Sequence, residues 1–167
     1  GDIKHDFRRA KYEGKEEVRT IIRLIRDAAK VVIVKGNHDN YVQNIVADMG
    51  IPVVDHVDVG GYRLEHGHID SGVRPVIIGH EHPSVKIVGA LSGGIKMQCF
   101  MYAREDGVIV IPPFSFLSSG TDFAMSADDF MSDACKGANM EMAELYGITE
   151  LGLIELGVLS EVCNIRI

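Results

Sequence analysis

Apolar and polar residues follow two different periods in the first third of the chain. Over 15–29, apolar residues recur every three to four positions, with glutamates early and arginines later, which predicts an amphipathic helix. The apolar run at 31–34 predicts a short buried strand. A second helix is predicted over 41–49, ending at Gly50, and a second strand over 52–55. This alternation of helix and strand indicates an α/β sheet.

Strands and turns dominate the pattern further along. The segments 57–59 and 62–65 flank Gly60-Gly61, a two-residue signal for a β-hairpin. More strands are predicted at 76–78, 85–90, 95–103 and 107–111. Residues 112–145 predict loop and short helix, and 150–167 one or two edge strands. We therefore expect an α/β fold in which a second, mixed or antiparallel sheet packs on the first.

Composition narrows the class of protein. A chain of 167 residues with 46% hydrophobic and 25% charged residues suits one globular domain. The net charge is −7 and the sequence has no lysine- or arginine-rich block. Any binding of phosphate must therefore come from a local site or from metal ions. The three cysteines form no CxxC pair, and no apolar run approaches the roughly 18 residues of a membrane span. These features favour a soluble, cytoplasmic protein with no membrane partner.

Six of the seven histidines lie at or just beyond predicted strand ends, beside glycines. The four groups are Asp2 with His5, Asn37-His38-Asp39, His66 with His68, and His80 with His82. Active sites of open α/β sheets form at the carboxyl ends of strands. Imidazole, carboxylate and amide ligands suit manganese, iron or zinc and do not suit calcium. The sequence therefore predicts a metal site at these strand ends.

Each group has a simpler explanation when taken alone. Asp2 alone is most often a solvated turn residue, and His66 or His68 alone is more often a loop histidine. The Gly36-Asn37-His38-Asp39 run is more specific, because these residue types together at a strand end rarely serve packing. If 80–82 is extended, His80 and His82 point the same way and Glu81 points elsewhere. His56 belongs to no group, and we interpret it as structural.

The order GD-x-x-H, GNHD, HGH and GHEH resembles the calcineurin-like metallophosphoesterase superfamily. GDIKH, IIGHEHP and IPPFSFLSSGTDF look most similar to archaeal SbcD-related phosphoesterases, over about residues 1–125. The resemblance implies two facing mixed β-sheets flanked by helices, in a single domain over 1–167. It also implies two divalent metal ions, Mn²⁺ foremost, with Fe, Zn or Ni as alternatives. The substrate would be a phosphate ester, with nucleic acid and nucleotides both open.

The resemblance also implies a role for each residue of the four groups. Asp2 would bridge two metals; Asn37, His66 and His80 would hold one of them and His82 the other. His38 would touch no metal and would protonate the leaving oxygen. His5 would orient His38, and Asp39 would support the same loop. His68 has no assigned role, because the first histidine of HGH is the expected ligand.

One departure from the superfamily pattern leaves alternatives open. An Asp-x-His motif on a first strand normally precedes the GD motif, and none precedes Asp2. We expect the chain to be an incomplete domain that lacks this strand. The alternative to a hydrolase is a non-catalytic metal-binding or scaffold protein derived from the same fold. The aromatic and methionine residues of 113–145 would cover the second sheet, with a protein interface as the other interpretation.

Overall fold

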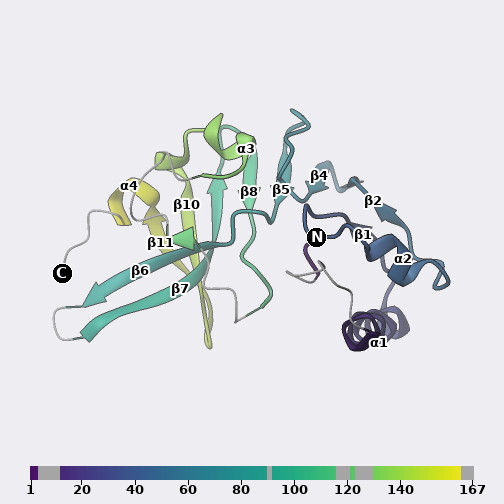
Figure 1. Cartoon of the computed structure of the whole chain (residues 1–167). Coiled ribbons are helices and arrows are strands. Elements are labelled where there is room, and N and C mark those ends of the chain that lie inside the picture. Colours follow the sequence, from purple (N-terminus) through teal and green to yellow (C-terminus); the bar gives the residue numbers. More distant parts are fainter. Residues whose placement is uncertain (4–11, 90–91, 116–120, 123–129, 163–167) are drawn as a thin grey trace.

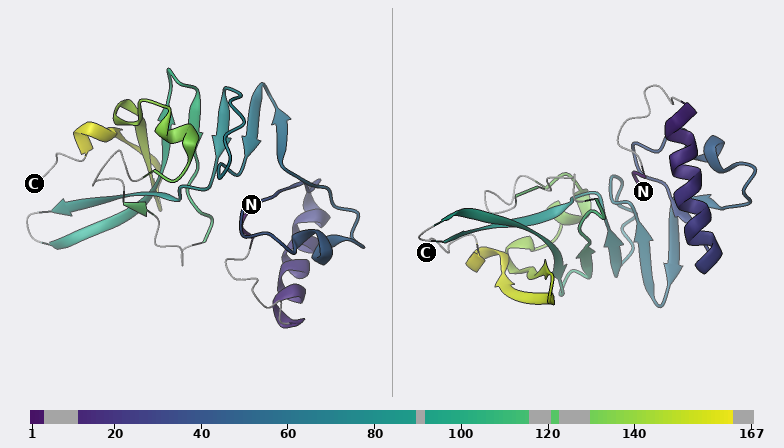
Figure 2. Two further views of the ribbon diagram at one scale, coloured as in Figure 1. Left: turned by 45° about the horizontal axis from the view of Figure 1, so that its top comes forward. Right: turned by 90° about the horizontal axis from the view of Figure 1, so that it is seen from below.

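The computed structural model describes residues 1–3, 12–89, 92–115, 121–122 and 130–162 (Figure 1). Its elements form a two-stranded sheet and a nine-stranded sheet with a few helices, which confirms the expected α/β class with two sheets. The two sheets belong to two hydrophobic cores at opposite ends of the molecule (Figure 2). No helix of the described part is long and apolar enough to cross a membrane.

The smaller core is built from the N-terminal elements. These are α1 (Tyr12–Ala28), β1 (Ile33–Val34), α2 (Val42–Val46) and β2 (Val53–Val54). Strands β1 and β2 pair in parallel, and Ile33 packs with Val18 and Ile22 of α1. Arg19 ties the two helices together, because its guanidinium binds the Asp48 carboxylate (2.7 Å) and the carbonyl oxygen of Ile45 (2.8 Å). The predicted alternation of helix and strand is therefore confirmed.

Helix α1 confirms the helix predicted over 15–29, but its buried stripe is narrower than the sequence pattern suggests. Val18 and Ile22 are buried, whereas Ile21, Leu24 and Ile25 are exposed. The helix packs on α2, and a single helical neighbour covers only one ridge of side chains. The apolar residues one position away on the helix surface therefore face solvent.

The larger sheet contains the remaining strands. They are β3 (His56–Val59), β4 (Tyr62–Glu65), β5 (Val76–Ile78), β6 (Pro83–Gly89), β7 (Ser92–Ala103), β8 (Val108–Val110), β9 (Thr121–Asp122), β10 (Glu144–Thr149) and β11 (Gly152–Val158). The order is β11-β10-β7-β8-β5-β4-β3, and β6 pairs with β7 and β9. Strands β4, β5 and β8 run parallel to one another. Their carboxyl ends therefore meet at one edge of the sheet.

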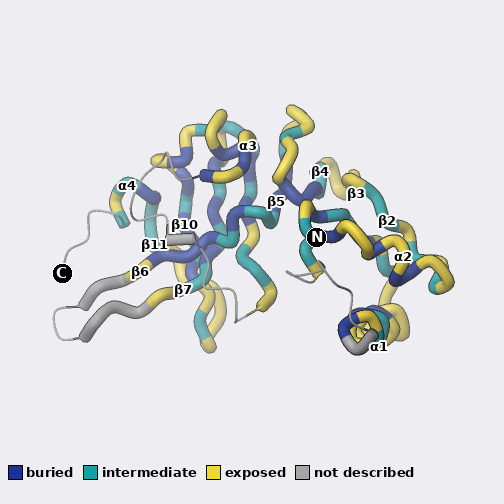
Figure 3. The backbone as a smooth tube through the Cα atoms, viewed as in Figure 1, coloured by how far each residue is buried: buried dark blue, intermediate teal, exposed yellow. Residues whose placement is uncertain are grey.

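The predicted irregular segment 112–145 is only partly irregular. It contains α3 (Asp133–Lys136) and the 3₁₀ turn Met140–Met142, as expected, but β10 begins at Glu144 and pairs with β7. Phe130 and Met140 lie in the larger core, whereas Met131 and Met142 are exposed. Figure 3 shows the buried backbone concentrated in the central strands. The predicted edge strand in the tail is β11, followed by α4 (Leu159–Val162).

Two buried cysteines provide a test of the larger core. Burial raises the pKa of both the Cys99 and the Cys135 thiol to about 12. Since the thiolate is the nucleophile, we expect neither thiol to react with iodoacetamide at pH 8 in the folded protein. Peptide mapping after alkylation should find both unmodified without denaturant and both modified in 6 M guanidinium. Modification of Cys99 at the same rate in both conditions would contradict this packing.

Candidate metal centre

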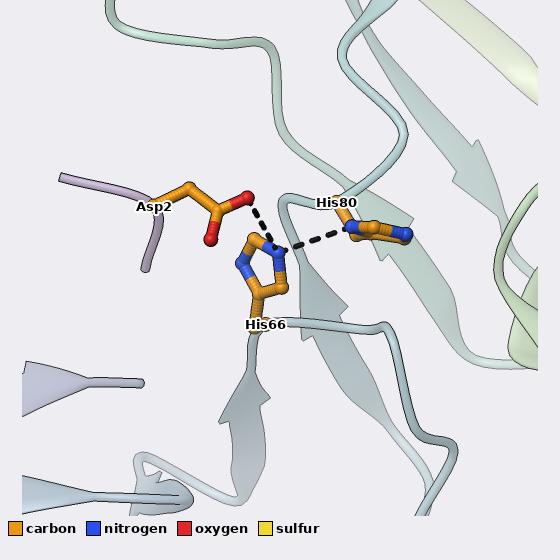
Figure 4. Close-up of side chains that lie close together, drawn as sticks. All are labelled: Asp2, His66 and His80. Carbon is orange, nitrogen blue, oxygen red and sulfur yellow. Dashed lines mark hydrogen bonds and ion pairs between the residues drawn. The ribbon is translucent and has the colours of Figure 1, made fainter. Parts of the chain in front are cut away.

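Four chain segments meet at the carboxyl ends of β1, β4 and β5. They are residues 1–3, the loop 35–39 after β1, the residues after β4 and the turn after β5. His66 directly follows β4, and its carbonyl oxygen accepts the backbone N–H groups of Gly79 (3.1 Å) and His80 (2.9 Å). These two hydrogen bonds continue the pairing of β4 with β5 beyond the strand ends. His66 and His80 are thereby held side by side (Figure 4).

The ligand atoms of Asp2, His66 and His80 all lie within 4.8 Å of one another. His66 Nε2 is 3.2 Å from Asp2 Oδ2 and 3.1 Å from His80 Nδ1. It is also 3.0 Å from Asn37 Oδ1. A ring nitrogen carries at most one hydrogen, so it cannot satisfy three such neighbours at once. A cation among these four side chains would satisfy all of them, and the donor set suits manganese, iron or zinc.

The approach of Asp2 to the loop after β1 requires glycine at position 36. A Cβ on Gly36 would lie 2.1 Å from Asp2 Oδ1 and 2.5 Å from the Asp2 backbone nitrogen. Such contacts are impossible, so no side chain fits at this position. The glycine allows the backbone N–H of His38 to donate to Asp2 Oδ1 (2.9 Å). The carboxylate is thus oriented by the same loop that carries Asn37.

Asp39 anchors residues 2 and 3 to the loop after β1. Its carboxylate is 1% exposed and accepts the backbone N–H groups of Asp2 (2.7 Å), Ile3 (3.1 Å) and Gly36 (2.9 Å). These bonds join the first residues of the chain to the loop after β1. Asp39 therefore positions Asp2, and it does so through the backbone.

Replacing Asp39 by alanine is expected to destabilise the protein by about 2–4 kcal/mol. Three backbone N–H groups would lose a charged acceptor, and those that stay buried would be unsatisfied. Urea unfolding followed by circular dichroism measures the loss, with the exposed Asp27 changed to alanine as the control. A change of less than about 0.5 kcal/mol, the range of ordinary surface substitutions, would contradict the anchoring role.

The turn after β5 differs from the extended conformation expected over 80–82. His80 and Glu81 form a turn, and His82 has a φ of 49°, so the side chains do not simply alternate. His82 is half-buried and does not belong to the Asp2, His66 and His80 group. In this turn the side chain of Glu81 is buried in the protein interior.

Glu81 is a buried anchor that the sequence did not reveal. It is 0% exposed, and its carboxylate accepts the backbone N–H of Met131 (3.1 Å) and, in a short hydrogen bond, that of Ser132. Burial raises the pKa of Glu81 against the effect of these hydrogen bonds. The only sequence signal was an acidic residue between two histidines at a strand end. Glu81 thus ties the turn that carries His80 to the segment before α3.

Two further residues of the predicted groups, His38 and His68, lie next to Asp2 and His66. His38 is half-buried next to Asp2 and is not one of the grouped ligands. The ring of His68 is exposed, with its centroid 5.3 Å from that of His66 and 6.2 Å from that of His80. His56 lies exposed in β3. His5 falls outside the described residues.

The site favours the protonation states that bind a cation. Burial raises the pKa of Asp2, but hydrogen bonds from the His66 ring and the His38 backbone outweigh burial and hold that pKa well below its usual 3.8. Burial, with the nearby His66, lowers the pKa of His80 to about 4. Asp2 is therefore ionised and His80 neutral at pH 7, as metal binding requires.

These shifts predict a pH-dependent stability of the metal-free protein. Between pH 6.5 and about 4 the unfolded chain protonates His80 while the folded protein does not, so stability falls as the pH falls. Burial lowers the pKa of His68 as well, with the same sign. Urea midpoints measured from pH 7 to pH 4 should decrease, and less steeply in His80→Gln. An equal slope in both proteins would contradict the assignment.

Comparison with known proteins identifies a structural neighbour. No protein-family model and no curated protein matches the chain. Among solved structures, the chain is similar to the nuclease MPE of Pseudomonas putida, with a TM-score of 0.56 and 25% sequence identity. The match covers 88% of this chain and 64% of the nuclease, so the chain spans less than two thirds of its neighbour's length.

Proposed function

We propose that this chain is a metal-dependent hydrolase of phosphate esters, specifically a phosphodiesterase that acts on nucleic acid. The observation that carries the proposal is the convergence of Asp2, Asn37 and His80 on one nitrogen of His66. The structural neighbour, a nuclease, supports the substrate class. We assign residues 1–167 to one domain of the calcineurin-like metallophosphoesterase superfamily, whose SbcD-related members its motifs resemble.

In the proposed site, Asp2, Asn37, His66 and His80 would hold one divalent ion, and Asp2 and His82 would contribute to a second. Manganese is the first choice for a donor set of imidazole, carboxylate and amide. Such ions would polarise the phosphoryl group and make water nucleophilic at neutral pH. The protein itself contributes orientation, because Asp39 fixes the backbone of Asp2 and Glu81 fixes the turn that carries His80.

His38 is the proposed proton donor to the leaving oxygen. Its backbone N–H donates to Asp2 Oδ1, so the residue lies beside the Asp2 carboxylate. In this proposal its imidazole would donate a proton to the ester oxygen of the leaving group. His5 is proposed to orient His38.

The alternative is a non-catalytic metal-binding protein. One observation favours it. Within the described residues, a single group of three imidazole and carboxylate ligands converges, which is enough for one metal ion and not for two. A binding protein would hold the ion without turnover, whereas the proposed hydrolase would release product.

Hydrolysis of bis-p-nitrophenyl phosphate with added Mn²⁺ tests the proposal. We expect turnover that EDTA abolishes and that His66→Ala removes. The matched control is His56→Ala, which deletes an exposed histidine in β3 and should leave the rate unchanged. If calorimetry detects Mn²⁺ binding but neither this ester nor single-stranded DNA is cleaved, the hydrolase assignment fails and the binding protein replaces it.

A further inference from the structure

A fully exposed aromatic side chain follows β8, the strand that pairs with β5. Phe114 is 103% exposed, at the end of the segment 111–115. Exposure of this extent is unusual for phenylalanine, which is among the residue types most often found buried. Its position relative to the metal group determines what it can contact.

The segment 111–115 leaves the sheet at the same edge as the metal-binding turn. Strand β8 is parallel to β5, and the backbone N–H of Ile111 donates to the carbonyl oxygen of Ile78 (2.8 Å). A Cβ on Gly79 would lie 3.5 Å from Ile111 Cγ1, so the start of the segment contacts the residue before His80. The ribbon that leaves β8 runs past His80 in Figure 4. Three residues span at most about 11 Å, so the Cα of Phe114 lies within about 11 Å of the Cα of Ile111, the residue that contacts Gly79.

The chain holds Phe114 in this place with a stiff backbone. Pro112 and Pro113 precede it, and each proline ring locks its own φ and restricts the residue before it. The carbonyl oxygen of Ser115 accepts a hydrogen bond from the Gln98 side chain of β7 (3.3 Å), which secures the far end. A rigid support reduces the entropy that an exposed ring loses when a ligand stacks on it.

The charge of the protein and the aromatic ring of Phe114 indicate which part of a substrate the ring would contact. The metal group takes phosphate, and the net charge of −7 with no basic block means that general attraction to a polyanion is weak. Additional affinity must then come from the uncharged part of the substrate. The flat face of a phenylalanine ring stacks on any nucleobase, without regard to sequence.

We propose that Phe114 is the stacking platform for an unpaired nucleobase next to the scissile phosphodiester. The proposal rests on the proposed function and narrows its substrate to single-stranded nucleic acid. In a duplex the base faces are stacked inside the helix and do not reach the ring. The protein therefore distinguishes single strands from duplexes through one side chain at the rim of the site.

Two fluorescent substrates of equal length test this proposal: an oligothymidylate and an oligonucleotide of stable tetrahydrofuran abasic residues. With Mn²⁺, Phe114→Ala should lower kcat/KM on oligothymidylate by roughly 5- to 150-fold, the range expected from one lost stack. The rate on the abasic strand should not change. Phe114→Trp should keep the preference for bases. The matched control is Leu151→Ala, which removes an equally exposed apolar side chain (100%) in the turn between β10 and β11.

The outcomes separate this inference from the proposed function. If the unmodified protein cleaves neither strand, the proposed function itself fails. If it cleaves both, and Phe114→Ala changes neither rate, the stacking role is overturned while the hydrolase stands. An equal loss on both strands would show that Phe114 serves the structure of the site and would also overturn the stacking role.

Discussion

Changing Asp2 to asparagine is expected to weaken Mn²⁺ binding at least about 100-fold and to abolish phosphodiester cleavage. Residues that merely support metal ligands cost 10- to 100-fold when removed, so a direct ligand should reach or exceed the upper value. Asparagine keeps the size of the side chain and an oxygen that can accept from the His38 backbone. It removes the negative charge, which lies 3.2 Å from His66 Nε2. The measurement is calorimetric titration with Mn²⁺ together with the rate on bis-p-nitrophenyl phosphate.

The control for Asp2 is Asp27→Asn, which neutralises an exposed carboxylate on α1. It changes the net charge equally and should leave both measurements unaltered. An Asp2→Asn protein that binds Mn²⁺ within threefold of the unmodified protein would contradict the site. Normal Mn²⁺ binding in the unmodified protein, combined with no cleavage, would favour the binding-protein alternative.

Changing His38 to alanine should lower kcat by about 10²- to 10⁴-fold while Mn²⁺ affinity stays within threefold. The range is that of a lost general acid. Affinity should persist because the hydrogen bond from His38 to Asp2 comes from the backbone, which alanine retains. The loss should appear with an alkyl leaving group, such as a nucleoside, and be small with p-nitrophenolate, which leaves without a proton.

His56→Ala serves again as the control, because that histidine lies exposed in β3. Equal losses with both leaving groups would exclude proton donation by His38. A parallel loss of Mn²⁺ affinity would instead assign His38 to the metal ligands. Each result therefore identifies a different role for the same side chain.

Local patterns in the sequence were sufficient for several elements. The helical period over 15–29 predicted α1, and the Gly60-Gly61 signal predicted the hairpin of β3 and β4. Helix formation and tight turns depend on residues a few positions apart, so the sequence records them directly. Strand β10 was missed because its pairing with β7 depends on a distant partner. The exposure of Ile21 and Ile25 was missed for a related reason, since burial of one helix face depends on its neighbours.

The backbone partners of the anchors Glu81 and Asp39 could not be predicted from the chain alone, although a supporting role was expected for Asp39. Glu81 accepts backbone hydrogen bonds from Met131 and Ser132, and Asp39 accepts them from Asp2 and Ile3. Each bond joins segments that are far apart in sequence. Nothing near Glu81 or Asp39 in the chain identifies the backbone groups that they bind.

By itself, the sequence determined which ligands are available and that Asn37, His66 and His80 each follow a strand, because residue types and strand periods are local properties. Only the tertiary structure decided that Asp2, His66 and His80 come within 4.8 Å of one another. That convergence depends on the parallel pairing of β4 with β5 and on the close approach of Asp2 to Gly36. Both are contacts between distant segments, which form only when the sheet is assembled and the cores are packed.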